Sequence, residues 1–585
     1  MKLSGPTIIF LVAAVAVWPL LMNGPSCGDD FYFHFISWSD AQRSMLQGVL
    51  YPHWANSANF GVGEPRFVFY PPFTWMLGAL MGLVLPWKGA ALGLTFLLLA
   101  ATGLANRALA RQVLADGPAT LAGCAAICLG RSLSDITQRS AYAELTGGFW
   151  IPLLLLFLLR NRNPSGRFWQ RVFDGSTVPL ALLVAGIWLS NGPLGIEADY
   201  LLAATALVVA ALQKSWAPVA RAMCGGSIGM ALTSAYLIPA VWERNWANFQ
   251  DAVTRPNYRI ENSWLFGRHS DPTLFLHDRT LFGISVIAVA MIVVTLGAAL
   301  VAWRRGRLPG ERRWWIPLAL ISIAVLFLQL PVSLPLWNWL PEFRLLQFPW
   351  RWLLLMQPSL AIFFASAVWV GPSRRRTVIL TTCAILFFLV STVTWVFCFN
   401  DCKAFDARFK IWEAGEGADG KPEYAPPDIQ YRLVLPDVPT NCLVSDLNEL
   451  TNISGEAGDG LNPVRTRSAS MCRGKFTEPM NQPEKKGFIG VADQPGYLIL
   501  GLRNYPAWKA TVNGHPATIL QERGHGLMAV SVTQGPVIVV VEWTTTADVI
   551  VGRWLSAIAL ILFTGIYLLE RRLCRFRLSN PGRLP

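Results

Sequence analysis

Long apolar segments alternate with short polar ones along almost the whole chain of 585 residues. About 20 helical residues are needed to cross the roughly 30 Å hydrocarbon core of a bilayer, and many of the segments approach this length. The pattern predicts a polytopic bundle of transmembrane helices. We expect twelve spans, at residues 7–22, 89–105, 118–131, 146–159, 177–190, 198–213, 218–240, 281–303, 314–330, 352–371, 377–398 and 550–569.

Arginine residues gather between these segments in clusters at residues 107–111, 160–167, 304–313, 374–376 and 571–577. Cytoplasmic loops carry such an excess of basic residues, so the clusters orient the chain. Both termini are then cytoplasmic, and residues 24–72 and 242–280 form external loops. Residues 72–87 are predicted to lie along the interface or to dip into it. A cleavable signal peptide is the alternative for residues 7–22, but the later topology needs this helix.

The polar stretch at residues 399–548 differs in kind from the rest. Gly, Pro and Asp are frequent, and GYLILGL, KATVNG, LMAVSVTQG and VIVVVEW are typical of strands separated by turns. Asn513-Gly514 predicts the turn of a hairpin. We therefore expect a mostly α transmembrane module at 1–398, an extracytoplasmic β-sandwich-like domain at 399–548, and a final helix with a basic cytoplasmic tail at 549–585.

Composition supports a membrane protein and argues against several other classes. Charged residues make up 15% of the chain, against roughly 25% in soluble domains. The 25 Trp residues suit a protein with many membrane–water interfaces. The net charge of +13 comes from clusters between apolar segments, which does not suggest nucleic-acid binding. There is no GxxxxGK[ST] motif for ATP and no Cys/His cluster with zinc spacing. The predicted spans carry few charges, which argues against a proton-coupled transporter.

Five cysteines, Cys27, Cys398, Cys402, Cys442 and Cys472, are predicted to lie outside the membrane or near its outer surface. An oxidising exterior would let two of Cys402, Cys442 and Cys472 form a structural disulfide. The sequence does not decide which two.

The stretch NGPSCGDDFYFHFISW, beginning at Asn23, places the adjacent carboxylates Asp29 and Asp30 just outside the first span. Acidic residues favour the first turn of a helix, which accounts for one of the pair. Neighbours on a helix do not share a face, so one carboxylate can face a cavity while the other caps the helix or binds a metal. His34 could meet Asp30 on one face, as a ligand or as a hydrogen-bonded packing residue.

The loop that follows is too aromatic for an ordinary solvated linker, and a loop of this length without strands is usually functional. Its candidate substrate-binding residues are His53, Trp54, Glu64, Arg66 and Tyr70. Aromatic faces can stack on sugar rings, while Arg and His can bind phosphates. The alternative is that the loop simply packs over the bundle.

A second external loop supplies Arg139, Tyr142 and Glu144 just before a span. Glu144 is a candidate second carboxylate, and a helix-cap or solvated role at the membrane rim is its alternative. Asp135 and Glu197 are weaker candidates.

Arg344 and Arg351 lie on the external side, where arginine is disfavoured. An Arg at headgroup depth could bind a lipid phosphate. The alternative is an interfacial side chain snorkelling beside neighbouring Trp residues.

Taken in order, these features resemble the GT-C-fold glycosyltransferases, which are polytopic enzymes that use sugars carried on polyprenyl phosphates. The acidic pair before Phe31, the loop with YPHW and FYPP, RLLQFPWRWLLL, and NYPAWKATVNGHPATIL before a final span are similar to a bacterial, YfhO-like branch. The likeness covers most of the chain in the order of features, but only these short stretches in residues.

The resemblance implies an enzyme of the bacterial cytoplasmic membrane that moves a sugar from a polyprenyl-phosphate donor to an envelope glycan, lipid or protein on the outer face. Asp29 maps onto the family's catalytic carboxylate and Asp30 onto its acidic neighbour. The acceptor hydroxyl must lose a proton to a base, and the leaving phosphate needs a cation or Arg. Asp29 and Asp30 could hold Mg²⁺ or Mn²⁺, which prefer oxygen ligands, but members of the superfamily differ in metal use.

Two other functions are kept as alternatives. A transporter or flippase of lipid-linked glycans would need polar groups along a central path, and the sequence shows few. A non-catalytic scaffold would use the β-rich domain to bind polysaccharide and would tolerate substitution of Asp29.

Overall fold

The computed structural model describes residues 3–579 except 162–165, 250, 309, 428, 430, 431, 433, 435–437, 446–471, 474 and 523. Five predicted features include residues outside the described part: the basic loop at 160–167, the external loop at 242–280, the basic cluster at 304–313, the β-rich stretch at 399–548 and the basic tail at 549–585.

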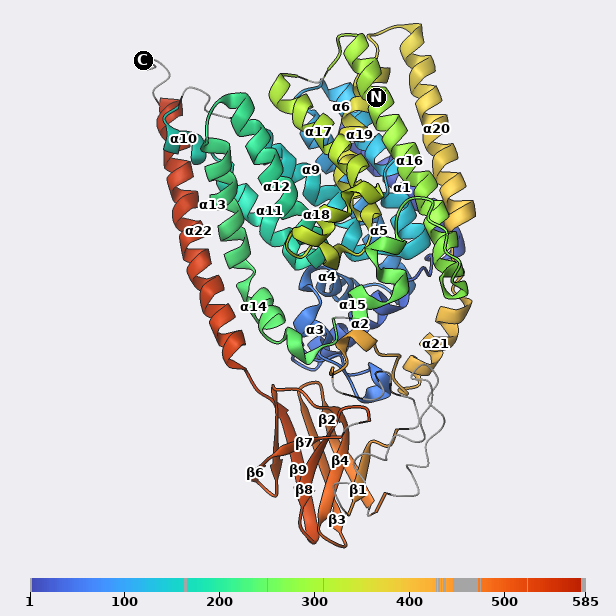
Figure 1. Ribbon diagram of the computed structural model, residues 1–585, viewed down its shortest axis with the longest axis vertical. Helices are drawn as coiled ribbons and strands as arrows, with labels where there is room; N and C mark the ends of the chain where they lie inside the picture. The colour runs from blue at the N-terminus through green and yellow to red at the C-terminus, as the bar shows by residue number, and fades with distance from the viewer. Residues whose placement is uncertain are drawn as a thin grey trace.

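Apolar helices form the larger part of the molecule and pack as a bundle (Figure 1). All twelve segments predicted to span the membrane are helical. The helices of the bundle are α1 (Gly5–Asn23), α5 (Trp87–Ala110), α6 (Asp116–Cys128), α9 (Gly147–Leu159), α11 (Thr177–Ser190), α12 (Gly192–Gln213), α13 (Ala217–Leu232), α14 (Ser234–Trp242), α16 (Phe275–Arg304), α17 (Arg312–Leu328), α18 (Leu334–Trp339), α19 (Leu353–Val368), α20 (Arg374–Cys398) and α22 (Ala547–Ser579).

The described residues support eight to ten spans rather than twelve. Eight helical segments are long and apolar enough to cross a membrane alone. Two more qualify only as bent pairs, α13 with α14 at 73° and α17 with the segment Pro331–Trp339 at 97°. The second bend falls at Pro331, since proline disfavours a helical residue before it. Helices α6 and α11 have 13 and 14 residues, or roughly 20 Å at 1.5 Å per residue, which is short for a span.

Shorter helices fill the space between the bundle and the β-strands. They include α2 (Phe31–Leu46), α3 (Arg66–Phe69), α4 (Pro72–Gly82), α15 (Asp251–Thr254) and α21 (Lys403–Glu413). The short helix α10 (Phe168–Val172) instead packs against α13 at the end of the bundle far from the strands (Figure 1). Helix α4 forms the first part of the predicted interfacial segment and packs against α2 and α5. Helix α21 lies in the stretch predicted to be β-rich, and the first strand begins only at Asn441.

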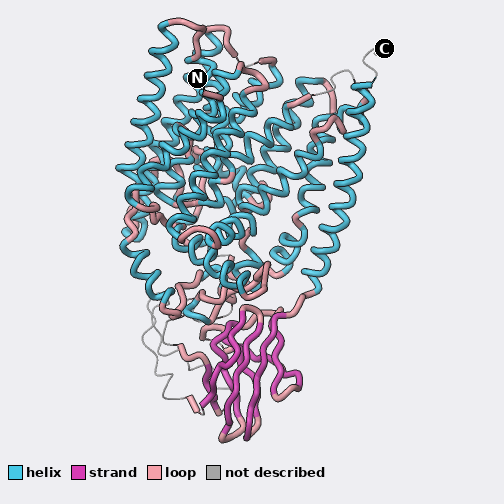
Figure 2. The backbone as a smooth tube through the Cα atoms, turned by 180° about the vertical axis from the view of Figure 1, so that it is seen from behind, coloured by secondary structure: helices cyan, strands magenta, loops and turns pink. Residues whose placement is uncertain are grey.

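The described strands form two packed antiparallel sheets, as the alternation of apolar residues predicts (Figure 2). One sheet has the order β1-β4-β8-β7 and the other β2-β3-β9-β5-β6. The strands are β1 (Asn441–Val444), β2 (Lys475–Gln482), β3 (Lys485–Ala492), β4 (Gly496–Arg503), β5 (Trp508–Val512), β6 (His515–Ala517), β7 (Ile519–Gln521), β8 (Leu527–Val532) and β9 (Gly535–Trp543).

The hairpin predicted at Asn513-Gly514 joins β5 to β6, with Val512 opposite His515. Asn513 and Gly514 both have positive φ, at 50° and 81°, as a two-residue hairpin turn requires. A disulfide between Cys442 and Cys472 lies in the same domain, and this pair is among those left open by the sequence.

Both termini lie at one end of the bundle and the β-sandwich lies at the other (Figure 1). We call the second end the β-domain end. The aromatic loop after α2 joins the two parts, because Trp54 and Phe69 share a hydrophobic core with Tyr505 and Trp508 of the sandwich. The sequence predicted that this loop is external. In the structure, part of the loop is buried between the bundle and the sandwich.

Candidate functional site

Five charged side chains at the β-domain side of the bundle form a continuous set of ion pairs, which we call the ion-pair network. Asp30 directly precedes α2, and Arg131 precedes α7 (Ser132–Ser134). Asp135 and Arg139 begin and end a π-helical turn, η2 (Asp135–Arg139), and Glu144 lies on α8 (Tyr142–Leu145). Single π-helical turns are frequent at functional sites.

Glu144 stands at the centre of the network. Its Oε1 lies 2.8 Å from Nη2 of Arg131, and its Oε2 accepts from Nη1 of Arg139 at 2.6 Å. Arg131 also pairs with Asp135 through Nε at 2.9 Å, and Arg139 pairs with Asp30 through Nη2 at 3.1 Å. Arg131, Asp135 and Glu144 are buried, whereas the Asp30 side chain is 37% exposed. The network therefore runs from the interior to the surface and ends at Asp30.

The neighbouring carboxylates of the network favour the charged form of the Arg139 guanidinium. Burial opposes the charge of this guanidinium, but Glu144, Asp30 and Asp135 outweigh burial and raise the pKa of Arg139 above its ordinary value. Burial raises the pKa of Asp135, against the lowering effect of Arg131, and its Oδ2 has no hydrogen-bond partner in the described part of the chain. Three carboxylates thus share two guanidinium groups.

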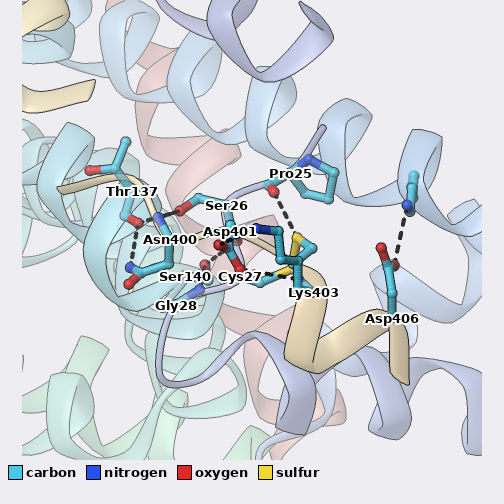
Figure 3. The surroundings of a disulfide bond; sticks show 12 residues. Pro25, Ser26, Cys27, Gly28, Thr137, Ser140, Asn400, Asp401, Lys403 and Asp406 are labelled. Carbon is cyan, nitrogen blue, oxygen red and sulfur yellow. Dashed lines mark hydrogen bonds and ion pairs between the residues drawn. A yellow bond between two sulfur atoms is a disulfide. The ribbon is translucent and has the colours of Figure 1, made fainter. Parts of the chain in front are cut away.

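Backbone contacts hold the loop that carries the two aspartates against η2 (Figure 3). The Asp30 N–H donates to the Arg139 carbonyl at 2.8 Å, and the Gly28 N–H donates to Ser140 Oγ at 3.1 Å. A Cβ at Gly28 would lie 2.3 Å from the Gln138 carbonyl oxygen, so this close approach requires glycine. The loop position is therefore set by the second external segment.

A disulfide ties the same loop to the segment after α20 (Figure 3). It joins Cys27 to Cys402, which are 375 residues apart in the sequence. Next to it, the Cys27 N–H donates to the Asn400 carbonyl at 3.1 Å, and Asn400 Nδ2 donates to the Gln138 carbonyl at 3.0 Å. The sequence left the partner of Cys402 open and did not consider Cys27, because a pairing at this separation depends on the tertiary fold.

The two adjacent carboxylates have different surroundings. Asp30 is bound by Arg139, whereas Asp29 is exposed and has no hydrogen bond or ion pair with any described residue. Desolvation and the Asp30 charge raise the pKa of Asp29 above its ordinary value, while Arg139 and Lys421 act in the opposite direction. Asp29 is therefore the free carboxylate of the pair.

His34 lies beneath the pair in an aromatic pocket rather than in a ligand set. It is 3% exposed, its Nδ1 lies 3.4 Å from the Tyr70 hydroxyl, and its ring meets Tyr142 edge-on at 5.5 Å. Burial lowers the pKa of His34 to about 4, although Asp30 acts to raise it. The imidazole is therefore neutral near pH 7 and cannot serve as a cationic phosphate ligand.

Asp29 and Asp30 do not form a complete set of protein ligands for Mg²⁺ or Mn²⁺ by themselves. Among the residues that the structure describes, no group of three or more His, Cys, Asp or Glu side chains could hold a metal ion. Asp30 is already engaged by Arg139, and His34 by Tyr70. The chemistry proposed below uses no metal at this position.

Two further residues from distant helices adjoin the network. Glu197 of α12 is buried, and its Oε1 has no partner within the described residues. Arg351, in the turn η9 (Pro349–Trp352), donates from Nη2 to Gln347 Oε1 at 3.2 Å, while its buried Nε has no such partner. Both interact electrostatically with Glu144. Arg351 thus supplies a third cation close to Glu144.

Four other candidates have structural partners away from the network. Glu64 and Arg66 form a fully buried pair, with Arg66 Nε and Nη2 at 2.7 Å and 2.6 Å from Glu64 Oε1. Trp54 is 1% exposed in the core shared with the sandwich. Arg344 pairs with Glu261 at 2.8 Å on the surface. These residues were predicted to bind substrate because they are aromatic or charged. Residue type alone does not show which side chains are buried against other parts of the protein.

His53 belongs to a separate region, where its Nδ1 lies 3.0 Å from Glu484 Oε1 of the sandwich.

The sequence analysis did not single out Arg131 of the network. The stretch RSLSDITQR places it four residues before Asp135, a spacing that supports a helical ion pair. Below the network, a cavity of only about 10 Å³ is lined by Arg131, Asp135 and Arg139, which is room for about one water.

The bundle of eight to ten candidate spans and the attached sandwich define a polytopic membrane protein. Residues 67–400 match the model of a family described as the 6-pyruvoyl-tetrahydropterin synthase related domain, a membrane protein family. The match covers more than half of the chain, and the chain belongs to this family. No curated protein matches it.

Two similar solved structures are of an oligosaccharyltransferase from Archaeoglobus fulgidus. One is a complex with zinc and sulfate, with 14% identity and a TM-score of 0.40, and the match covers 70% of this chain and 55% of that chain. The other is AglB with an inhibitory peptide and a dolichol-phosphate, with 12% identity and a TM-score of 0.41, covering 73% and 62%. The chain spans less than two thirds of the length of either neighbour.

Proposed function

We propose that this membrane protein is a glycosyltransferase of the GT-C type, with a polyprenyl-phosphate-linked sugar as donor and an envelope glycan, lipid or protein as acceptor. The β-domain end then faces the exterior of a bacterial cytoplasmic membrane, because the basic clusters favour a cytoplasmic location for the opposite end. The observation that carries the proposal is the asymmetry of the acidic pair, in which Arg139 binds Asp30 and Asp29 remains free.

In this proposal Asp29 is the general base. The acceptor hydroxyl attacks the anomeric carbon, the bond from that carbon to the phosphate oxygen breaks, and the hydroxyl proton passes to Asp29. A base of this kind contributes about 10²–10⁴ in rate. Asp30 and Arg139 would hold the base in position, since the loop is bound to η2 through both backbone and side chain.

The leaving group is a lipid phosphate, whose charge needs a cation. Arg131 and Arg139 are engaged by Glu144, Asp135 and Asp30. Arg351 has a buried Nε without a partner among the described residues and is the cation that we propose for the phosphate. Glu144 would then position the arginines rather than accept the proton.

The test uses purified protein in vesicles with a panel of radiolabelled polyprenyl-phosphate sugars. We expect Asp29→Asn to lower the rate of transfer by about 10²-fold or more, with normal expression and membrane insertion. Asp493→Asn, an exposed aspartate of the sandwich, is the matched control and should keep the wild-type rate. Full activity of Asp29→Asn would refute the site.

The same assay separates the two alternative functions. A flippase would move the labelled lipid between leaflets without forming a new glycosidic bond. A polysaccharide-binding scaffold would form no product and would bind glycan equally well with Asn at position 29.

A further inference from the structure

A cavity of about 300 Å³ lies between the sandwich and the last span, with walls different from those of the ion-pair network. The loop after α2 contributes Tyr51 and His53, the sandwich contributes Glu484 and Trp543, and α22 contributes Val549 and Arg553. It is far larger than the cavity of about 10 Å³ below the ion-pair network. It can hold a small polar group but not a folded partner.

Arg553 reaches this cavity from a lipid-facing surface. It lies in the second turn of the span Ala547–Leu573, at the end joined to the sandwich (Figure 1). Its neighbours Ile550, Val551 and Trp554 are 47%, 51% and 68% exposed, as expected of side chains that face lipid. Arg553 has no hydrogen bond or ion pair with the described residues, and an arginine near a helix end extends toward lipid phosphates.

The wall of the cavity opposite Arg553 carries the Glu484 carboxylate, which is held by His53. Glu484 Oε1 lies 3.0 Å from His53 Nδ1, and the Glu484 side chain is 26% exposed. The His53 ring is stacked on Trp543 at 5.5 Å, and Trp543 is also stacked on Tyr505 at 5.4 Å. Two rings of the protein therefore already pack on Trp543, which argues against a sugar stacked on it.

We propose that this cavity binds the headgroup of a zwitterionic phospholipid that carries a primary ammonium group, from the leaflet on the β-domain side. The phosphate would pair with Arg553 and the ammonium with Glu484, while the acyl chains would lie along the exposed apolar face of α22. A purely anionic headgroup would satisfy Arg553 but would offer no cation to the Glu484 carboxylate. Bound lipid would fasten the sandwich to the membrane surface.

The experiment is native mass spectrometry of the full chain in detergent, titrated with phosphatidylethanolamine, phosphatidylcholine or phosphatidylglycerol of matched acyl chains. We expect phosphatidylethanolamine to bind most tightly, and Arg553→Gln to weaken it by about tenfold or more, the size of one lost charge-assisted contact. Glu484→Gln should remove the preference for phosphatidylethanolamine over phosphatidylcholine. Soluble phosphoethanolamine should not compete at the same concentration, since it lacks the acyl chains.

Two controls keep the test decisive. Lys509→Gln removes one positive charge from an exposed site of the sandwich outside the cavity and should not change binding. Arg553→Lys keeps the charge and should retain most of the affinity. It also provides a second variant to measure in case Arg553→Gln unfolds the protein. Equal binding of the three lipids, or unchanged binding in both Arg553→Gln and Glu484→Gln, would overturn the proposal.

Discussion

Arg139 holds Asp30 at two points: its Nη2 donates to Asp30 Oδ2 at 3.1 Å, and its carbonyl oxygen accepts from the Asp30 N–H at 2.8 Å. The contact joins a loop near the N-terminus to a π-helical turn more than a hundred residues later. It also neutralises one member of an acidic pair and leaves the other, Asp29, free. The pair is thus two residues with different tasks rather than one symmetric site.

The pH dependence of transfer tests this difference. The Asp29 side chain is exposed, but desolvation by the surrounding protein and the Asp30 charge raise its pKa, so the rate should fall with decreasing pH at a higher pH than an ordinary aspartate would give. Asp30→Asn removes a negative neighbour and leaves Arg139 less engaged, and both changes lower the pKa of Asp29. The acid limb of the pH–rate profile should therefore shift to lower pH. An unmoved or upward-shifted limb would show that another group titrates.

Removing Arg139 should damage stability as well as activity. Arg139→Gln leaves Glu144 with one guanidinium in place of two and Asp30 with none, and breaking a buried ion pair costs about 3 kcal/mol of unfolding free energy. Thermal unfolding in detergent measures the loss. Arg344→Gln, which breaks the exposed pair with Glu261, is the control and should cost less than about 1 kcal/mol. Equal effects of the two substitutions would contradict a buried network.

The disulfide between Cys27 and Cys402 should affect activity through the Asp29 loop. Replacing both cysteines by serine frees a loop that begins two residues before Asp29, and we expect lower transfer with a loss of roughly 2–4 kcal/mol in stability. The matched variant replaces Cys442 and Cys472, whose bond lies within the sandwich. It should lower stability but leave most of the transfer activity. Activity assays and thermal unfolding distinguish the two double variants. Loss of transfer only in the variant without Cys442 and Cys472 would place the sandwich at the site.

Gly28→Ala tests the close contact between the loop and η2. The new Cβ would lie 2.3 Å from the Gln138 carbonyl oxygen, so the loop must move, at a cost of about 1–3 kcal/mol, and transfer should fall. Gly297→Ala is the control, because a Cβ there meets no atom within 4 Å. Comparison of unfolding temperatures and rates for the two variants checks the expectation. A neutral Gly28→Ala would mean that this approach is not required.

The sequence alone predicted those features that depend on local chemistry. Apolar runs predicted helices at every position where a span was expected, because a backbone surrounded by hydrocarbon must satisfy its hydrogen bonds internally. Alternating apolar residues and Asn513-Gly514 predicted the strands and the hairpin of the sandwich, since strand period and turn conformation are local properties. Asp29, Asp30 and Glu144 were recognisable because charges beside apolar runs are conspicuous.

Only the tertiary structure decided which of these residues act together. Arg131 joins Glu144, and Cys27 joins Cys402, through contacts between segments that are distant in the sequence. The Glu64–Arg66 pair is buried, whereas Asp29 is exposed, although all three were predicted to lie in one external loop, Asp29 as a catalytic residue and the other two as substrate-binding residues. Residue type states what a side chain can do, but its burial and partners depend on packing between segments. That packing left Asp29 free while Arg139 bound Asp30.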